Sequence, residues 1–593
     1  MWLICLLFCI LCVSDVKAAA IAKPNVLFIA IDDLNDWIGC LGGHPQARTP
    51  NLDRLAASGV LFTNAHCPAP ACNPSRTAIF TGRSPHRSGL YANNQSMREI
   101  LPKAELLPKT FSRAGYWAGG SGKMLHYFID AQSWDEYFPK KETENPFPRT
   151  LYPKQRPVSI PREPWQYVET DWTALDATDE EYGGDHLVAQ WVGQQLTKKH
   201  DRPFFLACGI YRPHEPWFVP KKYFEPFPLD SIQLPPGYKA DDLDDLPPEG
   251  KRRGPNRYFA HIRKHEQWKP AVQGYLASIY FADTMLGHVL DALEKGPNAT
   301  NTIVALWSDH GWHLGEKQHW QKFTAWRVCT RVPLILRVPK GASGLPAGTR
   351  PGVSNKPVSL LSLAPTLTEL AGLPPHQHHH GPSLLPLLKN PKADWPHVAL
   401  TQLAQPGSFG LSAERFRYIR YAGGDEELYD IRTDPHEWRN LAQEEQHAVT
   451  LRRLRALAPK EFAPAAQPSL DAMPSLKWVP LKAAAAAPAS KPVGGSFDVI
   501  FVNRRPQPVQ LFWMTPNGDR RHYATIAPGK TKRQRTRPGA VWQITDGTKA
   551  ARPLGYFRVD DRAAKAVVPR GANAGCPTST RRWRLGLVDA ESQ

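Results

Sequence analysis

The sequence has few cysteines for its length and, beyond its first residues, no apolar run long enough to cross a bilayer. Nine cysteines are scattered over 593 residues, and their spacing shows no dense disulfide framework. No stretch after residue 13 approaches the ~20 apolar residues that a membrane-spanning helix needs. Because the chain is too long for one hydrophobic core, we expect a mature protein of two or three domains without a transmembrane span.

The N-terminus is the exception to this lack of apolar runs. Residues 1–13 are almost wholly apolar, and small residues follow at 18–20. This order is typical of a signal peptide, here residues 1–20, although no Lys or Arg precedes the apolar run. We therefore expect export to the periplasm or the extracellular space, with an uncleaved membrane anchor as the alternative.

Acidic residues are scarce in the last part of the chain. The net charge is +18, and residues 491–593 contain 19 Lys or Arg against 7 Asp or Glu. A basic surface of this kind suits an acidic polymer such as a sulfated glycan or an anionic lipid, and export makes a nucleic acid partner unexpected. A solvated basic face without a ligand is the alternative.

Three apolar runs of strand length lack the alternation of a half-exposed strand. They cover residues 25–31, 203–208 and 302–307. Such runs are typical of strands buried on both faces of a parallel sheet. Helical patterns, for example at 49–55 and 361–371, alternate with them, so we expect an α/β domain around a mixed, mostly parallel sheet.

The rest of the chain changes character several times. Alternating runs and a Gly-Gly turn near residues 416–431 indicate a small antiparallel subdomain, and an Ala- and Pro-rich stretch indicates a linker. Alternating apolar runs separated by turn signals then predict an all-β sandwich. The expected parts are the α/β domain at 21–395, the subdomain at 396–460, the linker at 461–496, the sandwich at 497–570 and a tail at 571–593.

Acidic residues follow two of the expected buried strands directly. Asp32 and Asp33 come after the first run, and Asp309 and His310 come after the run at 302–307. Ligands of open α/β sheets gather at the carboxyl ends of the strands, where converging carboxylates repel one another unless a cation joins them. Oxygen ligands favour Ca²⁺ or Mg²⁺. Caps or turns at the strand ends are the alternative for each acidic pair.

Residues 72–76 carry the most specific pattern in the chain. Cys72-Asn-Pro-Ser-Arg76 is followed by Thr81-Gly-Arg83, and this pattern resembles the signature of type I sulfatases of the alkaline phosphatase superfamily. The resemblance implies an alkaline-phosphatase-like sandwich and the oxidation of Cys72 to formylglycine by a sulfatase-maturing enzyme. Six cysteines remain after the signal peptide, so at least one other cysteine then stays unpaired.

The resemblance extends over residues 24–445 and points to the iduronate-2-sulfatase branch. The matching segments are 122–126, 212–214, 308–316, 320–322 and 428–441. For catalysis the resemblance implies Cys72, Arg76, Lys123, His126, His214 and Lys322, of which Lys123, His214 and Lys322 bind substrate. For one Ca²⁺ it implies Asp32, Asp33, Cys72, Asp309 and His310 as ligands.

These residue types suit the hydrolysis of a sulfate ester. The ester is an anion, and fixed positive charge from Ca²⁺, Lys123, Lys322 and Arg76 would stabilise the charge that develops in the transition state. A hydrated aldehyde has two hydroxyls, one to attack sulfur and a second whose deprotonation, by His126, expels sulfate. His214 is the candidate general acid for the leaving alcohol.

The C-terminal sandwich resembles the von Hippel–Lindau β domain, which recognises hydroxyproline in a peptide. Residues 499–506 carry this resemblance, and Trp513, Tyr523, Thr536 and Trp542 fall at or near the pocket positions. Ala540 stands where that family has a pocket histidine. We expect the module to bind an acidic glycan or a protein partner.

The sequence leaves three questions open. The expected substrate is an O-sulfate on a carbohydrate of a sulfated polysaccharide, but a phosphonate or phosphate monoester hydrolase and a non-catalytic sulfoglycan-binding protein are the alternatives. The histidine run at 376–380 is interpreted as a solvated loop, with transition-metal binding as the alternative. Trp165, Tyr167 and Trp172 either stack on sugar rings or pack beneath a long insertion.

Overall fold

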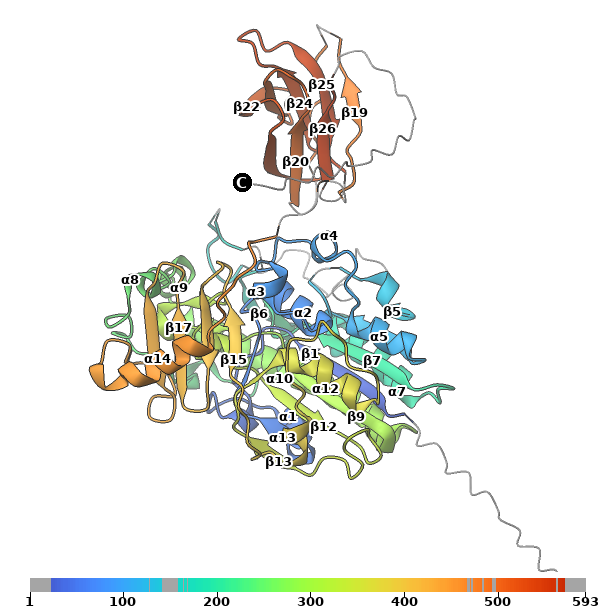
Figure 1. Cartoon of the computed structure of the whole chain (residues 1–593), viewed down its shortest axis with the longest axis vertical. Coiled ribbons are helices and arrows are strands. Elements are labelled where there is room, and N and C mark those ends of the chain that lie inside the picture. The colour runs from blue at the N-terminus through green and yellow to red at the C-terminus, as the bar shows by residue number, and fades with distance from the viewer. Residues whose placement is uncertain are drawn as a thin grey trace, which may run out of the picture. The chain divides into compact units, whose positions relative to one another are not determined.

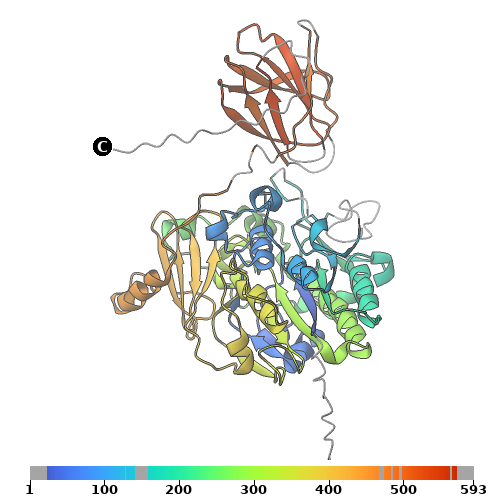
Figure 2. The same cartoon turned by 45° about the vertical axis from the view of Figure 1, so that its right-hand side comes forward.

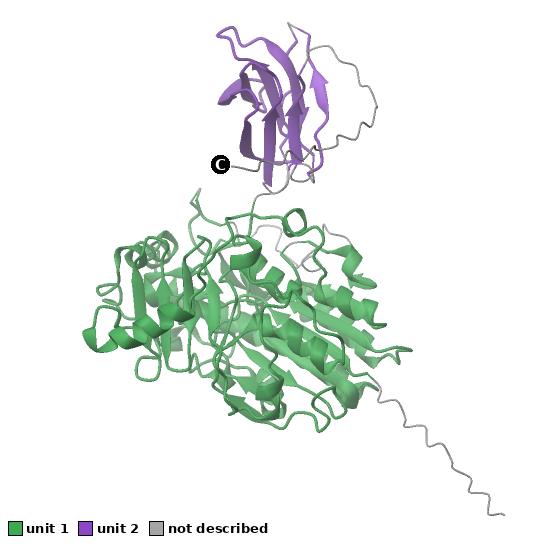
Figure 3. Cartoon of the chain, in the orientation of Figure 1, with its two compact units in different colours: residues 1–466 green, residues 467–593 purple. Residues whose placement is uncertain are grey.

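The computed structural model forms two compact units, residues 1–466 and residues 467–593 (Figure 3). The described residues are 23–126, 128–140, 158–163, 165–167, 169–466, 470, 473–482, 485–492, 497–560 and 564–570. The expected signal peptide, residues 1–20, and the tail, residues 571–593, lie outside the described residues. Among the described residues, no helix combines the length and the apolar character that a membrane crossing requires.

An eight-stranded sheet lies at the centre of the first unit. Its order is β13 (Gly352–Ser354), β2 (Val60–Phe62), β12 (Leu334–Arg337), β9 (Thr302–Ser308), β1 (Asn25–Ile31), β7 (Phe204–Ile210), β4 (Trp117–Gly122) and β5 (Glu136–Phe138). Only β12 runs against its neighbours; the other pairs are parallel. The expectation of a mixed, mostly parallel sheet is confirmed.

Helices cover both faces of this sheet (Figures 1 and 2). Alternate residues of β1 enter two different cores: Leu27, Ile29 and Ile31 face one, and Val26, Phe28 and Ala30 face the other. The first core is closed by α1 (Pro50–Ser58), α7 (Asp185–Thr197) and α10 (Trp268–Lys295). The second is closed by α2 (Cys72–Thr81), α5 (Leu107–Arg113) and α12 (Leu363–Leu370). Burial on both faces explains why the run at 25–31 does not alternate.

A smaller antiparallel sheet follows in the same unit. It consists of β15 (Ala399–Gln402), β16 (Phe409–Ser412), β17 (Phe416–Arg420) and β18 (Glu426–Asp430), joined in sequence order. Helix α14 (Ala448–Leu457) packs against it through Leu451 and Leu454. This arrangement confirms the expected small antiparallel subdomain.

The second unit is an all-β sandwich, as expected. One sheet has the order β19 (Trp478–Pro480), β25 (Pro553–Arg558), β24 (Val541–Asp546), β21 (Val509–Met514) and β22 (Arg520–Ile526). The other has the order β23 (Thr531–Thr536), β20 (Phe497–Asn503) and β26 (Ala564–Val568). Val499, Leu511, Trp542 and Phe557 form part of the core between the two sheets.

The segment predicted to be a linker, residues 461–496, differs from that prediction in part. Strand β19 pairs with β25, and Leu476 and Trp478 pack on the core of the sandwich. The high Ala and Pro content of the segment concealed these two apolar residues, which give residues 476–480 enough apolar surface to join the sheet. The other domain boundaries stay predictions.

Candidate active site

Four neighbouring strands of the central sheet end at one place. Strands β9, β1, β7 and β4 are consecutive in the sheet, and each is followed by residues singled out in the sequence. Asp309 and His310 follow β9, Asp32 and Asp33 follow β1, His214 follows β7, and Lys123 and His126 follow β4. Lys322 joins them from the segment after β11 (Trp320–Gln321), so eight of the ten predicted residues meet at one edge of the sheet.

Cys72 is the first residue of α2 and lies at the centre of this cluster. Its Sγ is 3.2 Å from Lys322 Nζ and 3.6 Å from Lys123 Nζ, and 3.3 Å from His310 Nε2. Burial would raise the pKa of the thiol, but Lys123 and Lys322 reverse this and hold the pKa well below its ordinary value. The position is therefore built to stabilise a negative charge on the side chain of residue 72.

Arg76, one turn further along α2, forms hydrogen bonds with the ends of three strands. Its Nε donates to Asp309 Oδ2 at 2.8 Å and its Nη2 donates to Asp32 Oδ1 at 3.0 Å. Its Nη1 donates to the carbonyl oxygens of Lys123 and Met124. The guanidinium is fully buried, so it fixes the carboxylates and the end of β4 rather than contacting solvent.

The carboxylates are arranged as a cation site. One ligand atom each from Asp32, Cys72, Asp309 and His310 lies within 4.8 Å of the others. Asp33 is also fully buried, and its Oδ2 has no hydrogen-bond partner. Burial raises the pKa of Asp33 to about 7, although Lys322 Nζ donates to its Oδ1 at 2.7 Å and acts to lower the pKa. An oxygen-rich donor set with an orphaned carboxylate oxygen fits a hard divalent cation.

His310 is oriented to face this cation site. Its Nδ1 lies 3.1 Å from the Gly311 carbonyl oxygen, which can only accept a hydrogen bond. In the neutral ring the proton therefore lies on Nδ1, and the lone pair of Nε2 faces the Asp33 and Asp309 carboxylates at 3.4 and 3.5 Å. A backbone carbonyl that orients a metal-binding imidazole in this way is a common arrangement in metal sites.

Two further histidines face residue 72 or its neighbours. His126, which is partly exposed, forms a hydrogen bond with Cys72, and burial lowers its pKa despite that contact. His214 Nδ1 lies 2.6 Å from the Glu215 carbonyl oxygen, so its Nε2 faces Asp33 Oδ2 at 3.7 Å. Burial and the nearby Lys123 hold the pKa of His214 well below its ordinary value.

The sequence pattern missed three residues that line the cluster. The ring of Tyr211 lies 5.1 Å from Lys123 Nζ, and the ring of Trp312 lies 5.2 Å from Lys322 Nζ. The buried Glu215 has a pKa of about 8, raised by burial. Tyr211 and Glu215 flank the segment that contains His214, so their nearness to it was the available signal.

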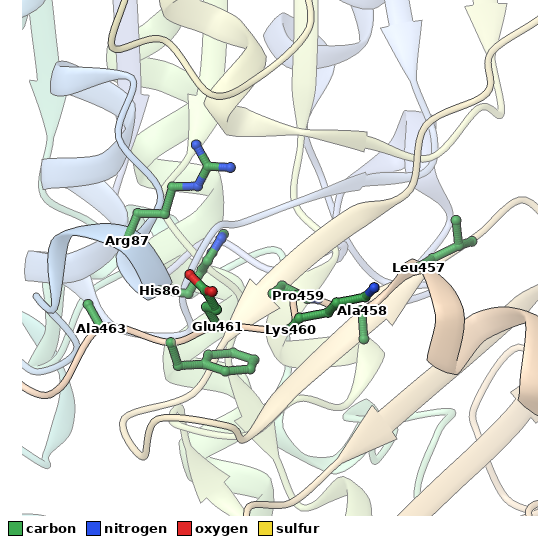
Figure 4. A pocket seen from close by; sticks show the side chains of 9 residues that line it. His86, Arg87, Leu457, Ala458, Pro459, Lys460, Glu461 and Ala463 are labelled. Atoms are coloured by element: carbon green, nitrogen blue, oxygen red, sulfur yellow. The ribbon is translucent and has the colours of Figure 1, made fainter. Parts of the chain in front are cut away.

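Other predicted features lie elsewhere or have a structural role. Trp172 is buried and stacks near Trp217, which supports packing rather than sugar binding for this residue. A cavity of about 700 Å³ is lined by His86, Arg87 and residues 457–463 (Figure 4). It contains none of the ten predicted site residues. The cavity lacks a set of converging charged groups comparable to the buried cluster around Cys72.

Family models match almost the whole described chain. The model described as "Sulfatase" matches residues 24–373, and the model of the C-terminal part of N-sulphoglucosamine sulphohydrolase matches residues 315–460. The model of the VHL beta domain matches residues 492–554, in the second unit. These matches confirm the resemblance of both parts of the chain.

Individual relatives and solved structures agree with these models. A sulfatase of Formosa agariphila is 38% identical over 477 residues, which cover 78% of this chain and 91% of the relative. Iduronate 2-sulfatase of Mus musculus is 31% identical over 456 residues, which cover 70% of this chain and 81% of the relative. The structure of a phosphonate monoester hydrolase of Agrobacterium radiobacter has a TM-score of 0.60 at 22% identity, covering 73% of this chain and 95% of that chain. The structure of a 2-O GAG sulfatase has a TM-score of 0.56 at 23% identity, covering 73% of this chain and 91% of that chain.

The solved structures share the fold, which confirms the expected alkaline-phosphatase-like architecture. The family model and the relatives cover the sheet, the strand ends and the segment of Cys72. The chain therefore belongs to the sulfatase family, and its reaction is the hydrolysis of a sulfate ester.

Proposed function

We propose that the chain is a formylglycine-dependent, Ca²⁺-binding sulfatase that removes O-sulfate from a sulfated carbohydrate. The observation that carries the proposal is the surroundings of residue 72. Its side chain lies between two lysine ammonium groups and beside the imidazole of His310. A nucleophile there is stabilised as an anion, and an anionic ester meets fixed positive charge.

Asp32, Asp33, Asp309 and His310 would hold the Ca²⁺, together with an oxygen of the modified residue 72. The orphaned Asp33 Oδ2 supports this assignment, as does the donor set. When bound, Ca²⁺ supplies a Lewis acid that orients the nucleophile and the sulfate oxygens. Arg76 keeps two of these carboxylates in place through its bonds to Asp32 and Asp309.

A formylglycine at position 72 would supply a geminal diol, which has one hydroxyl for attack on sulfur and another for release of the product. His126 is the candidate base for this second hydroxyl. It already contacts the side chain of residue 72, and its lowered pKa keeps the ring neutral and able to accept a proton. Lys123 and Lys322 would hold the sulfate oxygens, since both ammonium groups lie within 3.6 Å of the Cys72 sulfur.

His214 is the candidate acid for the leaving alcohol. Its Nδ1 faces a carbonyl oxygen, so the proton that it donates would be on Nε2, which faces the site. Burial, together with Lys123 and Lys322, lowers its pKa. An anionic ester bound between these lysines would offset their charge and allow His214 to be protonated before the ester bond breaks.

Support for a carbohydrate substrate comes from the relatives. The mouse relative is named for iduronate, a sugar acid, and a Formosa agariphila relative with 27% identity is named an ulvan-active sulfatase. Residues 1–20 would direct export to the periplasm or the extracellular space, where sulfated polymers are found. The particular sugar and the position of its sulfate are left to a panel of sulfated oligosaccharides.

The proposal is tested by release of nitrophenol from nitrophenyl sulfate and nitrophenyl phosphate. The protein is produced with and without a co-expressed sulfatase-maturing enzyme, and the mass of the peptide that contains residue 72 is measured. We expect sulfate release that requires both maturation and Ca²⁺, and that is lost in Cys72→Ala. Equal activity without maturation would contradict the formylglycine mechanism, and faster phosphate release would favour the phosphate or phosphonate hydrolase alternative.

For the second unit we propose a role in binding the sulfated polymer. Strands β22 and β23 each pair with one strand among the described residues, so both are edge strands. Arg520 and Arg521 on β22 and Arg535 on β23 are exposed, and Tyr523 is 40% exposed with Arg521 5.9 Å from its ring. Arginines beside an exposed aromatic ring suit a sulfated sugar, which offers both anionic groups and a flat ring face.

The edge strands are tested in the full chain with the double variant Arg521→Gln/Arg535→Gln. The matched control is Lys549→Gln/Arg552→Gln, which removes the same charge from the exposed turn before β25. We expect the first variant alone to raise KM severalfold for a sulfated polysaccharide at low salt. Neither variant should change the kinetics on nitrophenyl sulfate. Equal losses with both variants would show that net charge, rather than this surface, binds the polymer.

A further inference from the structure

A second group of metal-ligating side chains lies outside the active site. Asp179 belongs to α6 (Asp179–Tyr182), His186 to α7 and His288 to α10. One ligand atom from each of these three residues lies within 4.8 Å of the other two. The group shares no residue with the cluster around Cys72, and the proposed function does not use it.

The carboxylate of Asp179 is held in one orientation but only half satisfied. Its Oδ2 accepts hydrogen bonds from Lys222 Nζ at 2.8 Å and from the Tyr223 hydroxyl at 2.9 Å. Its Oδ1 is buried and has no hydrogen-bond partner, in a residue that is 6% exposed. An unpaired buried carboxylate oxygen is costly, and the two bonds to Oδ2 keep Oδ1 from turning toward another donor.

His186 shows the same deficiency beside it. Its Nδ1 is buried without a hydrogen-bond partner, so an acceptor or donor is missing on this side of the ring too. The rings of His186 and His288 lie 6.1 Å apart and nearly perpendicular, at 88°. His288 is exposed, so solvent reaches the third member of the group.

We propose that Asp179, His186 and His288 bind a divalent transition metal of the Zn²⁺ class. Two imidazoles and one carboxylate form a nitrogen-rich ligand set that suits Zn²⁺, whereas Ca²⁺ and Mg²⁺ prefer sets dominated by oxygen ligands. The metal would satisfy the orphaned oxygen of Asp179. Lys222 and Tyr223 would serve as outer-shell partners that orient this carboxylate. Water would take the fourth position on the exposed side.

The distances allow such a site with small side-chain movements. Zn²⁺ bonds of about 2.0–2.2 Å place ligand atoms of a tetrahedral site roughly 3.5 Å apart, and the present separations are up to 4.8 Å. His288 supplies the adjustment, because an exposed side chain can change rotamer without disturbing the core. The buried Asp179 stays where Lys222 and Tyr223 hold it.

A metal at this place would join three helices next to the active site. Asp185, the residue before His186, accepts hydrogen bonds from the backbone N–H groups of Tyr211 and Arg212 at 2.7 and 2.9 Å. These residues directly precede the segment that carries His214. Binding of the metal would therefore fix the start of α7, and through Asp185 the loop after β7, against α6 and α10.

The histidine run at 376–380 is the competing place for such a metal. It has more histidines, but it is not among the groups of three or more ligand atoms that converge in the described part of the chain. The His376 and His379 rings stack on each other with centroids 5.1 Å apart. The run therefore supplies the control for the test.

The test uses the full-length protein, stripped with a chelator and then kept in excess Ca²⁺ so that the catalytic site is not the variable. Zn²⁺ is added, unbound metal is removed by gel filtration, and the bound zinc is measured by mass spectrometry. We expect wild type and His378→Gln to bind one equivalent more than His288→Gln or His186→Gln. We also expect Zn²⁺ to raise the Tm of wild type and of His378→Gln only.

Two results would overturn the proposal. One is an equal zinc content in wild type and His288→Gln, with equal Tm shifts on addition of Zn²⁺. The other is loss of the bound zinc in His378→Gln, which would assign it to the histidine run. Because His288 is exposed, its replacement by glutamine should leave the fold intact, and circular dichroism of the metal-free variant checks this.

Discussion

Replacement of Arg76 by lysine keeps the positive charge of the active site but removes the planar fork that joins its parts. Arg76 donates to Asp309, to Asp32 and to the backbone at the end of β4. A lysine ammonium is a single point charge without the guanidinium fork, so it can pair well with only one of the two carboxylates. The other carboxylate would then lose the guanidinium while remaining fully buried.

The expected cost follows from this loss. Removing one partner of a buried ion pair costs about 3–5 kcal/mol in the free energy of unfolding. With an unfolding entropy near 2.1 cal/mol/K per residue, a unit of this size loses roughly 1 °C of Tm per kcal/mol, so Tm should fall by about 3–5 °C. Displacement of the two carboxylates and of Lys123 should lower kcat/KM for nitrophenyl sulfate by ~10–100-fold, as for an outer-shell partner of a metal site.

Arg54→Lys is the matched control for this variant. Arg54 also pairs with two acidic residues, Asp291 at 2.6 Å and Glu294 at 2.9 Å, but its side chain is 33% exposed. Exposed pairs contribute only about 0–1 kcal/mol, so Tm and kcat/KM should hardly change. The reasoning would be refuted if Arg76→Lys, measured by scanning calorimetry and steady-state kinetics, behaved like Arg54→Lys.

Three further outcomes are expected. Asp309→Asn should abolish the rise in Tm on addition of Ca²⁺ and lower kcat/KM by more than ~100-fold. A rise in Tm equal to that of wild type would contradict the place of Asp309 in the cation site. Gly122→Ala should lower kcat/KM by displacing Lys123. Gly122 has φ +73°, and an added Cβ would lie 2.0 Å from a backbone oxygen of β7. Kinetics equal to those of wild type would show that the strand ends can shift without loss of activity. Burial would raise the pKa of Asp130, but hydrogen bonds from Arg98 and Ser133 outweigh burial and lower this pKa. The Arg98–Asp130 ion pair therefore stabilises the fold at pH values above the unfolded pKa of ~3.9. This stabilisation is lost as the pH falls through the lower pKa of the folded state. The Tm difference between wild type and Arg98→Gln should therefore be present at neutral pH and shrink in acid, and a constant difference would exclude this pair as its source.

The central sheet could be predicted from the sequence because its strands are buried on both faces. Residues 25–31 have no polar side chain after Asn25, and the structure places all seven in β1 with alternate residues in two cores. The cation site was foreseeable for a related reason. Carboxylates that directly follow such strands must meet at the sheet edge, so Asp32 and Asp309 came together without any knowledge of the loops.

Other parts depend on contacts that no local pattern carries. Tyr211 lies beside Lys123 because β7 and β4 are neighbours, and this pairing joins residues far apart in the chain. Trp478 joins the sandwich through β25, although its own segment is typical of a linker. The group of Asp179, His186 and His288 requires three helices to pack, and the spacing of these residues in the sequence gives no sign of a metal site.

The charges of the buried cluster bear on the choice between sulfate and phosphate. Asp32, Asp33 and Asp309 bring three negative charges, and Arg76, Lys123 and Lys322 bring three positive ones, all buried. A bound Ca²⁺ would leave two positive charges to be matched, since uncompensated charge is costly when it is buried. A sulfate ester has one negative charge and an ionised nucleophile has another, which together match them. A phosphate monoester has close to two negative charges near neutral pH, so its additional negative charge would be unmatched. Since the excess charge is set by the divalent cation, removal of Ca²⁺ should weaken the binding of sulfate more than that of a neutral sugar at the same site.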